Sequence, residues 1–321
     1  MFQIERSHRE TGEVIRQNSC LLESGDELEY LTFPSLEKTG IVRHLITTRL
    51  GGVSKGEFAS MSLSFTRGDR DEDVHENYRR IGHVLGCRPE NMVASQQTHT
   101  TNIRRVGVED GGKGITKPLD YKDVDGLITN DLGVALVTYY ADCVPLLFVD
   151  TVHRAIGAAH SGWRGTVGCM GQCMVSAMNE AFGTGPEDLE AAIGPSICQA
   201  CYEVNDEVAK QFEVLEQTTE ELRREIFKRG IYGKKSLGEP PRVVADGKAP
   251  GKYQLDLWLA NFLILCQAGI PMERIAVTDI CTCHNSEYLF SHRASGGRRG
   301  NLAAFLMLSP CTMPSLAERN H

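Results

Sequence analysis

The chain has 321 residues, of which 41% are hydrophobic and 24% are charged, which suits one large or two smaller globular domains. Its formal net charge of −8 argues against nucleic acid or an anionic membrane surface as the main partner. No run of about 18 apolar residues occurs, so we expect no membrane span, and the polar N-terminus is unlike a secretory signal. The eleven cysteines are spread through apolar and helical contexts, which favours a reduced, cytoplasmic protein over a disulfide scaffold.

The first predicted elements are a strand over 45–49, a glycine-containing loop over 50–56 and a helix over 71–86. The helix is indicated by apolar residues at helical spacing, namely Val74, Tyr78, Ile81 and Leu85. Gly86 fits the position just past its end, because glycine readily adopts the left-handed conformation that terminates many helices.

The middle of the chain is dense in β-structure, with strands predicted over 134–139, 144–150 and 154–159. Continuous apolar runs of this length are typical of strands that are buried on both faces. A helical pattern follows over 166–182 and stops at Gly183.

Further strands are predicted over 189–193 and 274–280, and a helix spans the apolar positions 255–266. Between them, residues 212–252 favour an exposed helix followed by a long loop, which we interpret as an excursion from the core. The irregular alternation predicts an α+β fold, a single domain with a mixed β-sheet core flanked by helices. We assign residues 1–40 to an N-terminal extension packed on the core and 41–321 to the catalytic domain.

Three residues in the first half stand out as candidate metal ligands, namely His99, Cys143 and His160. Two imidazoles and one thiolate suit zinc, and three protein ligands leave one position open for water or substrate. Taken singly, such a histidine is more often a hydrogen-bonded core residue and such a cysteine a packing residue. Asp142, beside Cys143, is a candidate proton acceptor or a partner that orients a histidine, with a turn residue as the alternative.

Two arginines are candidates for binding phosphate, because a guanidinium group can donate two hydrogen bonds to phosphate oxygens. Arg164 lies at a predicted helix N-terminus and Arg49 lies beside the glycine loop, although either could form an ordinary surface ion pair. The Cys198–Cys201 pair and the segment 281–284 invite a second metal or redox site, but their context favours structural cysteines near the site. The basic, glycine-rich segment 290–300 could close over an anionic substrate or form a solvated turn.

From residue 47 to residue 308 the chain resembles the laccase-domain family, once called multicopper polyphenol oxidoreductases, which includes the bacterial YfiH and YlmD proteins. The resemblance is carried by several motifs in the same order, at 47–54, 97–99, 141–145, 160–166, 193–197, 201–204, 281–282 and 290–291. The chain departs from the family pattern at Thr98, Thr100 and Ser161, in the segment 281–284 and at 292–294.

The resemblance implies mixed β-sheets flanked by helices, akin to a toxin deamidase catalytic domain, with His99, Cys143 and His160 as the metal ligands. It also implies a purine nucleoside phosphorylase that acts on adenosine, inosine, guanosine and methylthioadenosine, with adenosine deaminase activity as well. The expected partners are purine nucleosides and phosphate, the expected metal is zinc with copper possible, and the expected assembly is a monomer or homodimer. The expected catalytic residues are Asp142, Cys143 and His160, and Arg49 and Arg164 are the expected phosphate ligands.

Three other functions remain open at this point. A copper-dependent polyphenol oxidase is disfavoured, because a multicopper site needs many histidines and the chain has ten, with no His-x-His pair. A Cys–His hydrolase or amidase in peptidoglycan quality control would use Cys143 as nucleophile and His160 as base. A non-enzymatic metal-binding module is the third alternative. The H-x-E and P-C-x-x-C signature of zinc nucleobase deaminases is absent, so any deaminase activity would be an independent solution.

Overall fold

The computed structural model describes residues 2–6, 13–232 and 239–310, and these form two six-stranded sheets and a small three-stranded sheet. The first sheet has the order β1-β2-β3-β15-β7-β4. Its strands are β1 (Arg16–Leu21), β2 (Glu27–Thr32), β3 (Val42–Thr47), β15 (Leu302–Leu308), β7 (Ala135–Tyr140) and β4 (Met92–Ala94). All neighbouring pairs are antiparallel except β4 and β7, so the sheet is mixed.

The second sheet has the order β14-β10-β8-β9-β6-β5. Its strands are β14 (Ile275–Val277), β10 (Leu189–Ile193), β8 (Val144–Asp150), β9 (Ala155–Ser161), β6 (Gly126–Thr129) and β5 (Ile103–Arg105). The edge pairs β10–β14 and β5–β6 are parallel and the central pairs are antiparallel. Both sheets are therefore mixed, as the sequence predicts.

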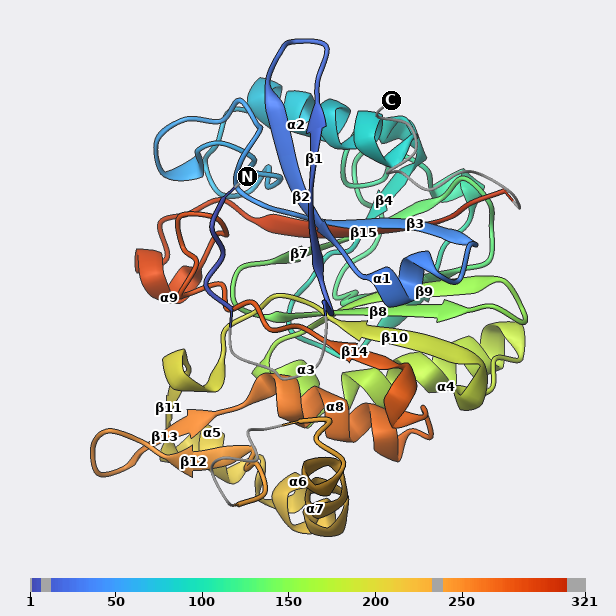
Figure 1. Cartoon of the computed structure of the whole chain (residues 1–321). Helices are drawn as coiled ribbons and strands as arrows, with labels where there is room; N and C mark the ends of the chain where they lie inside the picture. The colour runs from blue at the N-terminus through green and yellow to red at the C-terminus, as the bar shows by residue number, and fades with distance from the viewer. Residues whose placement is uncertain (1, 7–12, 233–238, 311–321) are drawn as a thin grey trace.

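The two sheets lie face to face, with helices on their outer faces (Figure 1). One apolar cluster fills the space between the sheets and contains Leu136 and Leu306 from the first and Leu147 and Ala158 from the second. A second cluster joins the first sheet to α2 (Asp71–Leu85). A third joins the second sheet to α4 (Met170–Phe182) and α8 (Leu257–Gln267). Because both faces of each sheet are covered, the central strands are buried throughout.

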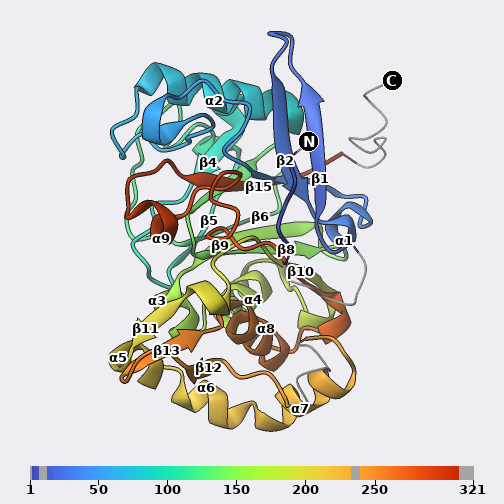
Figure 2. The ribbon, with the colours of Figure 1, turned by 60° about the vertical axis from the view of Figure 1, so that its left-hand side comes forward.

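A small sheet and three short helices lie together beside and below α8 (Figure 2), and their apolar side chains join the cluster that contains α8. The strands are β11 (Glu203–Asn205), β13 (Lys252–Leu255) and β12 (Val244–Asp246), and the helices are α5 (Asp206–Lys210), α6 (Glu213–Thr218) and α7 (Glu220–Lys228). Residues 233–238 lie outside the described residues, and over the rest of 212–252 the prediction of one exposed helix and a long loop is wrong in part. The helical stretch is broken at Thr219, and β12 and β13 pair where a loop was expected.

Several predicted elements are confirmed closely, including the strands 144–150 and 189–193 and the helix that begins at Asp71. Gly86 ends that helix with φ 74°, as expected. The predicted helix over 166–182 is wrong at its start. It is split into α3 (Trp163–Val167) and α4 because Cys169 takes φ 57°, which interrupts the helical backbone.

Two short helices complete the described part, α1 (Pro34–Glu37) and α9 (His292–Ser295). β1 pairs with β2 and β2 pairs with β3 in the first sheet, and the division of the chain at residue 40 stays a prediction. Within the described residues, no helix combines the length and the apolar character needed to cross a membrane.

Candidate metal centre

The three candidate ligands lie at the same end of the strands of the second sheet. They are His99, Cys143 and His160. His160 is the penultimate residue of β9 and pairs across the ladder with Pro145 of β8. Cys143 directly precedes β8, so the antiparallel register places its side chain near that end of β9. His99 lies between β4 and β5, in a loop that hydrogen bonds to the residue preceding β6.

The three side chains form one compact group of metal-ligand type. Their ligand atoms all lie within 4.8 Å of one another, and Cys143 Sγ is 3.9 Å from His99 Nε2. The two imidazole rings meet edge to face, with centroids 4.9 Å apart and an interplanar angle of 81°. His160 is buried whereas His99 is exposed, so the group has a closed side and a side that faces solvent.

The backbone beside this group leaves room only for a glycine. A Cβ atom on Gly162 would lie 2.9 Å from His99 Cδ2 and 3.0 Å from Cys143 Sγ. Real Cβ atoms almost never come this close to other atoms, so a side chain here would push the two ligands away. This cradle and the donor set of one thiol and two imidazoles fit zinc, and they also fit copper.

Asp125 contacts two of the three candidate ligands, and the sequence analysis did not identify it. Its carboxylate is fully buried, and Oδ2 lies 2.8 Å from His160 Nδ1. It also accepts hydrogen bonds from the backbone N–H groups of Thr98, His99 and Thr100. The carboxylate therefore fixes the loop that carries one ligand and leaves Nε2 of the other imidazole for a metal. The only local signal was an aspartate directly before a buried strand.

Cys143 and His160 perturb each other's protonation. Burial alone raises the pKa of Cys143, but the adjacent His160 and His99 outweigh it, and the net shift is downward. Burial alone lowers the pKa of His160, but Cys143 and Asp125 outweigh it, and the net shift is upward. The Cys143 sulfur is thus poised as a thiolate, which is the form that binds metal.

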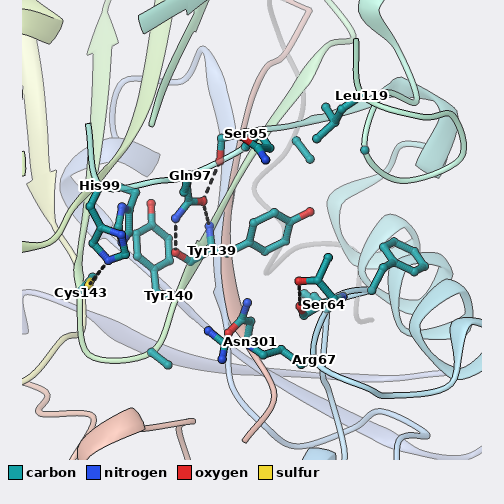
Figure 3. A pocket seen from close by; sticks show the side chains of 18 of the residues that line it. Ser64, Arg67, Ser95, Gln97, His99, Leu119, Tyr139, Tyr140, Cys143 and Asn301 are labelled. Carbon is teal, nitrogen blue, oxygen red and sulfur yellow. Dashed lines mark hydrogen bonds between the residues drawn. The ribbon is translucent and has the colours of Figure 1, made fainter. Parts of the chain in front are cut away.

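A cavity of about 310 Å³ opens beside the three ligands (Figure 3). It is lined by His99, Cys143 and His160 and by polar and aromatic groups that include Ser95, Gln97, Tyr139, Tyr140, Arg67, Arg299 and Asn301. Gln97 is held in place because its Oε1 accepts from Tyr139 N at 2.6 Å and its Nε2 donates to Tyr139 O at 2.8 Å. The wall of the cavity is therefore fixed by hydrogen bonds before any ligand binds.

Two arginines line the same cavity, one buried and one exposed. Arg299 is 8% exposed and donates to Gly300 O, while Arg67 is exposed at the protein surface. Burial, together with the positive charge of Arg67, lowers the pKa of Arg299 to about 10. Among the described residues, neither guanidinium forms an ion pair with a carboxylate, and the buried Nε of Arg299 has no hydrogen-bond partner. Two cations that face one cavity without a carboxylate form a site suited to an anion.

Asp142 lies beside Cys143, and its carboxylate is already engaged. Oδ1 accepts from Thr282 Oγ1 at 2.6 Å and Oδ2 accepts from Arg293 N at 2.7 Å. The backbone of Asp142 takes φ 86°, and its carbonyl accepts from Ile197 N at 3.0 Å. These bonds fix the turn that presents Cys143, whereas a proton-transfer role for the carboxylate stays a prediction.

The structure places Arg49 and Arg164 outside the lining of the cavity. Arg49 donates to two backbone carbonyls, Ala59 O at 2.9 Å and Ser286 O at 2.8 Å, and lies over the ring of Phe290. Arg164 is exposed and lies over the Trp163 ring, with 4.2 Å between Cζ and the centroid. Their predicted phosphate contacts stay predictions, and the structure offers Arg67 and Arg299 as further candidates.

Residues 43–309 match the family model described as multi-copper polyphenol oxidoreductase laccase. The chain is 34% identical over 261 residues to the purine nucleoside phosphorylase YlmD of Bacillus subtilis, which covers 81% of this chain and 86% of that protein. It is 33% identical over 279 residues to a purine nucleoside phosphorylase of Bacteroides thetaiotaomicron, which covers 87% of this chain and 96% of that protein.

Two solved structures share the fold. The crystal structure of YlmD from Geobacillus stearothermophilus matches with a TM-score of 0.74 and 34% identity, over 88% of this chain and 96% of that one. The crystal structure of the Bacillus licheniformis hypothetical protein YfiH matches with a TM-score of 0.75 and 28% identity, over 87% of this chain and 96% of that one. The predicted resemblance and the predicted α+β fold are both confirmed.

Proposed function

The chain belongs to the multi-copper polyphenol oxidoreductase laccase family, and on that premise we propose that it is a metal-dependent purine nucleoside phosphorylase. One observation carries this proposal beyond the names of the relatives. The candidate metal ligands and two arginines without carboxylate partners line the same cavity. A cavity of about 310 Å³ lies at the lower end of the range for small-ligand sites, roughly 300–1,000 Å³.

Phosphorolysis needs phosphate placed next to C1′ of the ribose while the purine leaves. The transition state carries positive charge on the sugar, so a site gains rate by orienting the phosphate anion against that carbon. Arg67 and Arg299 supply two guanidinium groups for the phosphate oxygens. Asn301 and Gln97 line the cavity as well. Asn301 Oδ1 accepts from Arg299 and the Gln97 amide is bonded to Tyr139, so both residues keep the wall of the cavity in place.

His99, Cys143 and His160 would hold the metal, with zinc as the proposed ion and copper as the alternative. When bound, such a metal supplies a Lewis acid that polarises a substrate atom or a water molecule. Asp125 orients His160 and the loop of His99, and Asp142 fixes the turn of Cys143. We assign both carboxylates a positioning role.

The proposed substrates are adenosine, inosine, guanosine and methylthioadenosine, together with phosphate. Adenosine deamination would use the same cavity, with water replacing phosphate as the attacking group and C6 of the purine as its target. We further propose that the protein acts in the cytoplasm as a monomer or homodimer.

A Cys–His hydrolase is the second candidate, because Cys143, His160 and Asp125 have the contacts of a nucleophile, a base and its orienting carboxylate. A hydrolase of this kind needs the Cys143 sulfur free of metal, whereas the phosphorylase proposal needs it bound. Zinc loading therefore changes the two activities in opposite directions.

The test begins with the purified protein, its zinc and copper content, and chromatography of adenosine and inosine incubated with and without phosphate. Free base that forms only with phosphate supports phosphorolysis, and inosine that forms from adenosine without phosphate supports deamination. If neither forms in the metal-loaded protein, the proposal fails. Thiol-dependent hydrolysis that zinc abolishes would favour the second candidate.

The arginine assignment is tested by Arg299→Met, with Arg298→Met as the matched control. Arg298 is exposed and pairs with Glu57 at 2.9 Å, so its loss leaves the cavity intact. A hydrogen bond to a charged group contributes about 1.5–3 kcal/mol, so we expect Arg299→Met to raise the KM for phosphate at least about tenfold. The assignment is wrong if both variants keep the KM of the unaltered protein.

A further inference from the structure

A second group of metal-ligand side chains lies outside the cavity, formed by Cys198, Cys201, Cys281 and His284. The sheet topology explains why residues so distant in sequence meet. β10 and β14 are parallel neighbours, so the segments that leave both strands emerge at the same edge. The pairing continues beyond the strands, because Ser196 forms a parallel bridge with Cys281 and Thr282 N donates to Ser196 O at 3.1 Å.

The four side chains converge on one point. Their ligand atoms lie within 4.8 Å of one another, and Cys198 Sγ is 3.9 Å from His284 Nδ1. In a tetrahedral zinc site with Zn–S bonds of about 2.3 Å, the sulfur atoms stand about 3.8 Å apart. The distance of 3.9 Å between Cys198 Sγ and His284 Nδ1 is close to this value, and the other ligand atoms lie near enough to share the same ion.

The backbone around the group also fixes its geometry. Cys198 N donates to Cys281 Sγ at 3.3 Å, which holds the sulfur of Cys281 against the Cys-x-x-Cys segment. Between Cys198 and Cys201 the chain makes a tight turn, in which Cys201 N donates to Cys198 O at 3.1 Å. This turn brings both sulfurs of the Cys-x-x-Cys pair to the same side, a spacing common in zinc sites.

The burial pattern also suits a structural metal. Cys198 and Cys281 are 7% and 1% exposed, Cys201 is half-buried, and His284 closes the group from the solvent side. All three cysteines are free thiols in the structure. The exposed carboxylate of Glu5 lies 3.9 Å from His284 Nδ1. An exposed ion pair of this kind contributes little to stability, so it does not compete strongly with a metal for His284.

We propose that Cys198, Cys201, Cys281 and His284 form a second zinc site, with four protein ligands and a structural role. Four protein ligands leave no open position, in contrast to the three beside the cavity. This proposal replaces the sequence interpretation, which favoured structural cysteines near the site over a second metal. It stands independently of the proposed function, because none of the four residues lines the cavity.

The second site contacts the first through Thr282, which lies between two of the second site's ligands in the sequence. Thr282 follows Cys281 directly, and its hydroxyl donates to Asp142 Oδ1 at 2.6 Å. Asp142 fixes the turn of Cys143, so a metal at the second site would immobilise the segment on which that turn rests. The second site is thus a positioning element, and its loss would loosen the first without removing any of its ligands.

The test counts zinc in the full-length protein purified with its metal. We expect two zinc ions per chain in the unaltered protein and one in Cys143→Ser, which removes a ligand of the first site only. In the Cys143→Ser background, cobalt substitution should give an intense sulfur-to-cobalt charge-transfer band, because three thiolates remain at the second site. Combining His284→Ala with Cys143→Ser should weaken binding of the remaining zinc ion at least about tenfold in a chelator competition. Because the His284 side chain is exposed, the fold of this double variant should survive.

The matched control is Cys283→Ser, in the same turn but outside the four-residue group, which should keep the zinc content of its background. The proposal is overturned if Cys143→Ser holds no zinc or binds cobalt without the charge-transfer band. It is also overturned if Cys283→Ser releases zinc while His284→Ala retains it, because the ligand set would then be a different one.

Discussion

Replacing Asp125 by asparagine tests whether a buried carboxylate organises the candidate metal centre. The substitution keeps the size and shape of the side chain but replaces one acceptor oxygen by an amide group that only donates. In the protein, the two oxygens of Asp125 face five donors, which are the Nδ1 group of His160, the backbone N–H groups of Thr98, His99 and Thr100, and the Thr100 hydroxyl. An asparagine cannot accept from both sides, so whichever way it turns, some of these donors face another donor.

The expected effect on metal binding is large because two ligands depend on the same carboxylate. A hydrogen bond to a charged group contributes about 1.5–3 kcal/mol, and loss of the partner that orients a metal-bound histidine costs about 10–100-fold in affinity or activity. The two ranges agree, since tenfold corresponds to about 1.4 kcal/mol. We therefore expect Asp125→Asn to weaken zinc binding 10–100-fold and to lower kcat/KM for nucleoside by a similar factor.

The assay is competition for zinc with a chromogenic chelator, alongside phosphorolysis rates at saturating zinc. Asp123→Asn is the matched control, because Asp123 lies two residues away and its exposed carboxylate accepts from the Thr98 hydroxyl at 2.7 Å. That control should bind zinc as the unaltered protein does. If Asp125→Asn also binds zinc with unchanged affinity while remaining folded, the carboxylate does not organise the centre and the reasoning fails.

Two further predictions concern burial and close packing. Burial lowers the pKa of His44 to about 3, and its Nε2 accepts from Phe33 N, so the folded state keeps the imidazole neutral while the unfolded chain takes up a proton below about pH 6.5. The contribution of the neutral His44 to stability is complete above pH 6.5 and declines as pH falls toward 3. Between pH 6.5 and 4.5, chemical denaturation should therefore show that the free energy of unfolding of His44→Gln falls by about 2 kcal/mol less than that of the unaltered protein. Equal decreases in the two proteins would contradict this prediction. Gly162→Ala should weaken zinc binding at least about tenfold in the chelator assay, because the added Cβ would press on two ligands. Gly165→Ala should not, because its added Cβ would meet no atom nearer than 3.6 Å. Equal effects would show that the close approach of the Gly162 backbone to the ligands is unimportant.

The sequence predicts best where local pattern and burial coincide. The apolar runs 144–150 and 189–193 have the same first and last residues as β8 and β10. Strands that are covered on both faces are apolar along most of their length, so the ends of the run mark the ends of the strand. The local context of the three candidate ligands singled them out, with two of them next to such strands, but their assignment as metal ligands followed from the family resemblance. The break at Cys169 could not be predicted, because a cysteine with positive φ has no sequence signature.

The groupings in space that the sequence analysis could not predict depend on long-range pairing. Arg299, in the segment 290–300 that the sequence offered for an anionic substrate, reaches the cavity because it precedes β15, and β15 pairs with β3 and β7, both more than 150 positions away in sequence. Asp125 reaches His160 because β6 pairs with β9, and the cysteines of the second group meet because β10 pairs with β14. Periodicity reports which face of a strand is buried, but it carries no information on which strand lies next to it.

The turn of Cys143 illustrates what this pairing achieves. Asp142 bonds to Ile197, in the segment that leaves β10, and to Thr282, in the segment that leaves β14. On the other side, Asp125 precedes β6 and bonds to His160 and to the loop of His99. The three ligands are thus fixed from both directions along the sheet, by groups that themselves lie at strand ends. A site held in this way is formed before metal or substrate arrives, so little of the binding free energy is spent on ordering it.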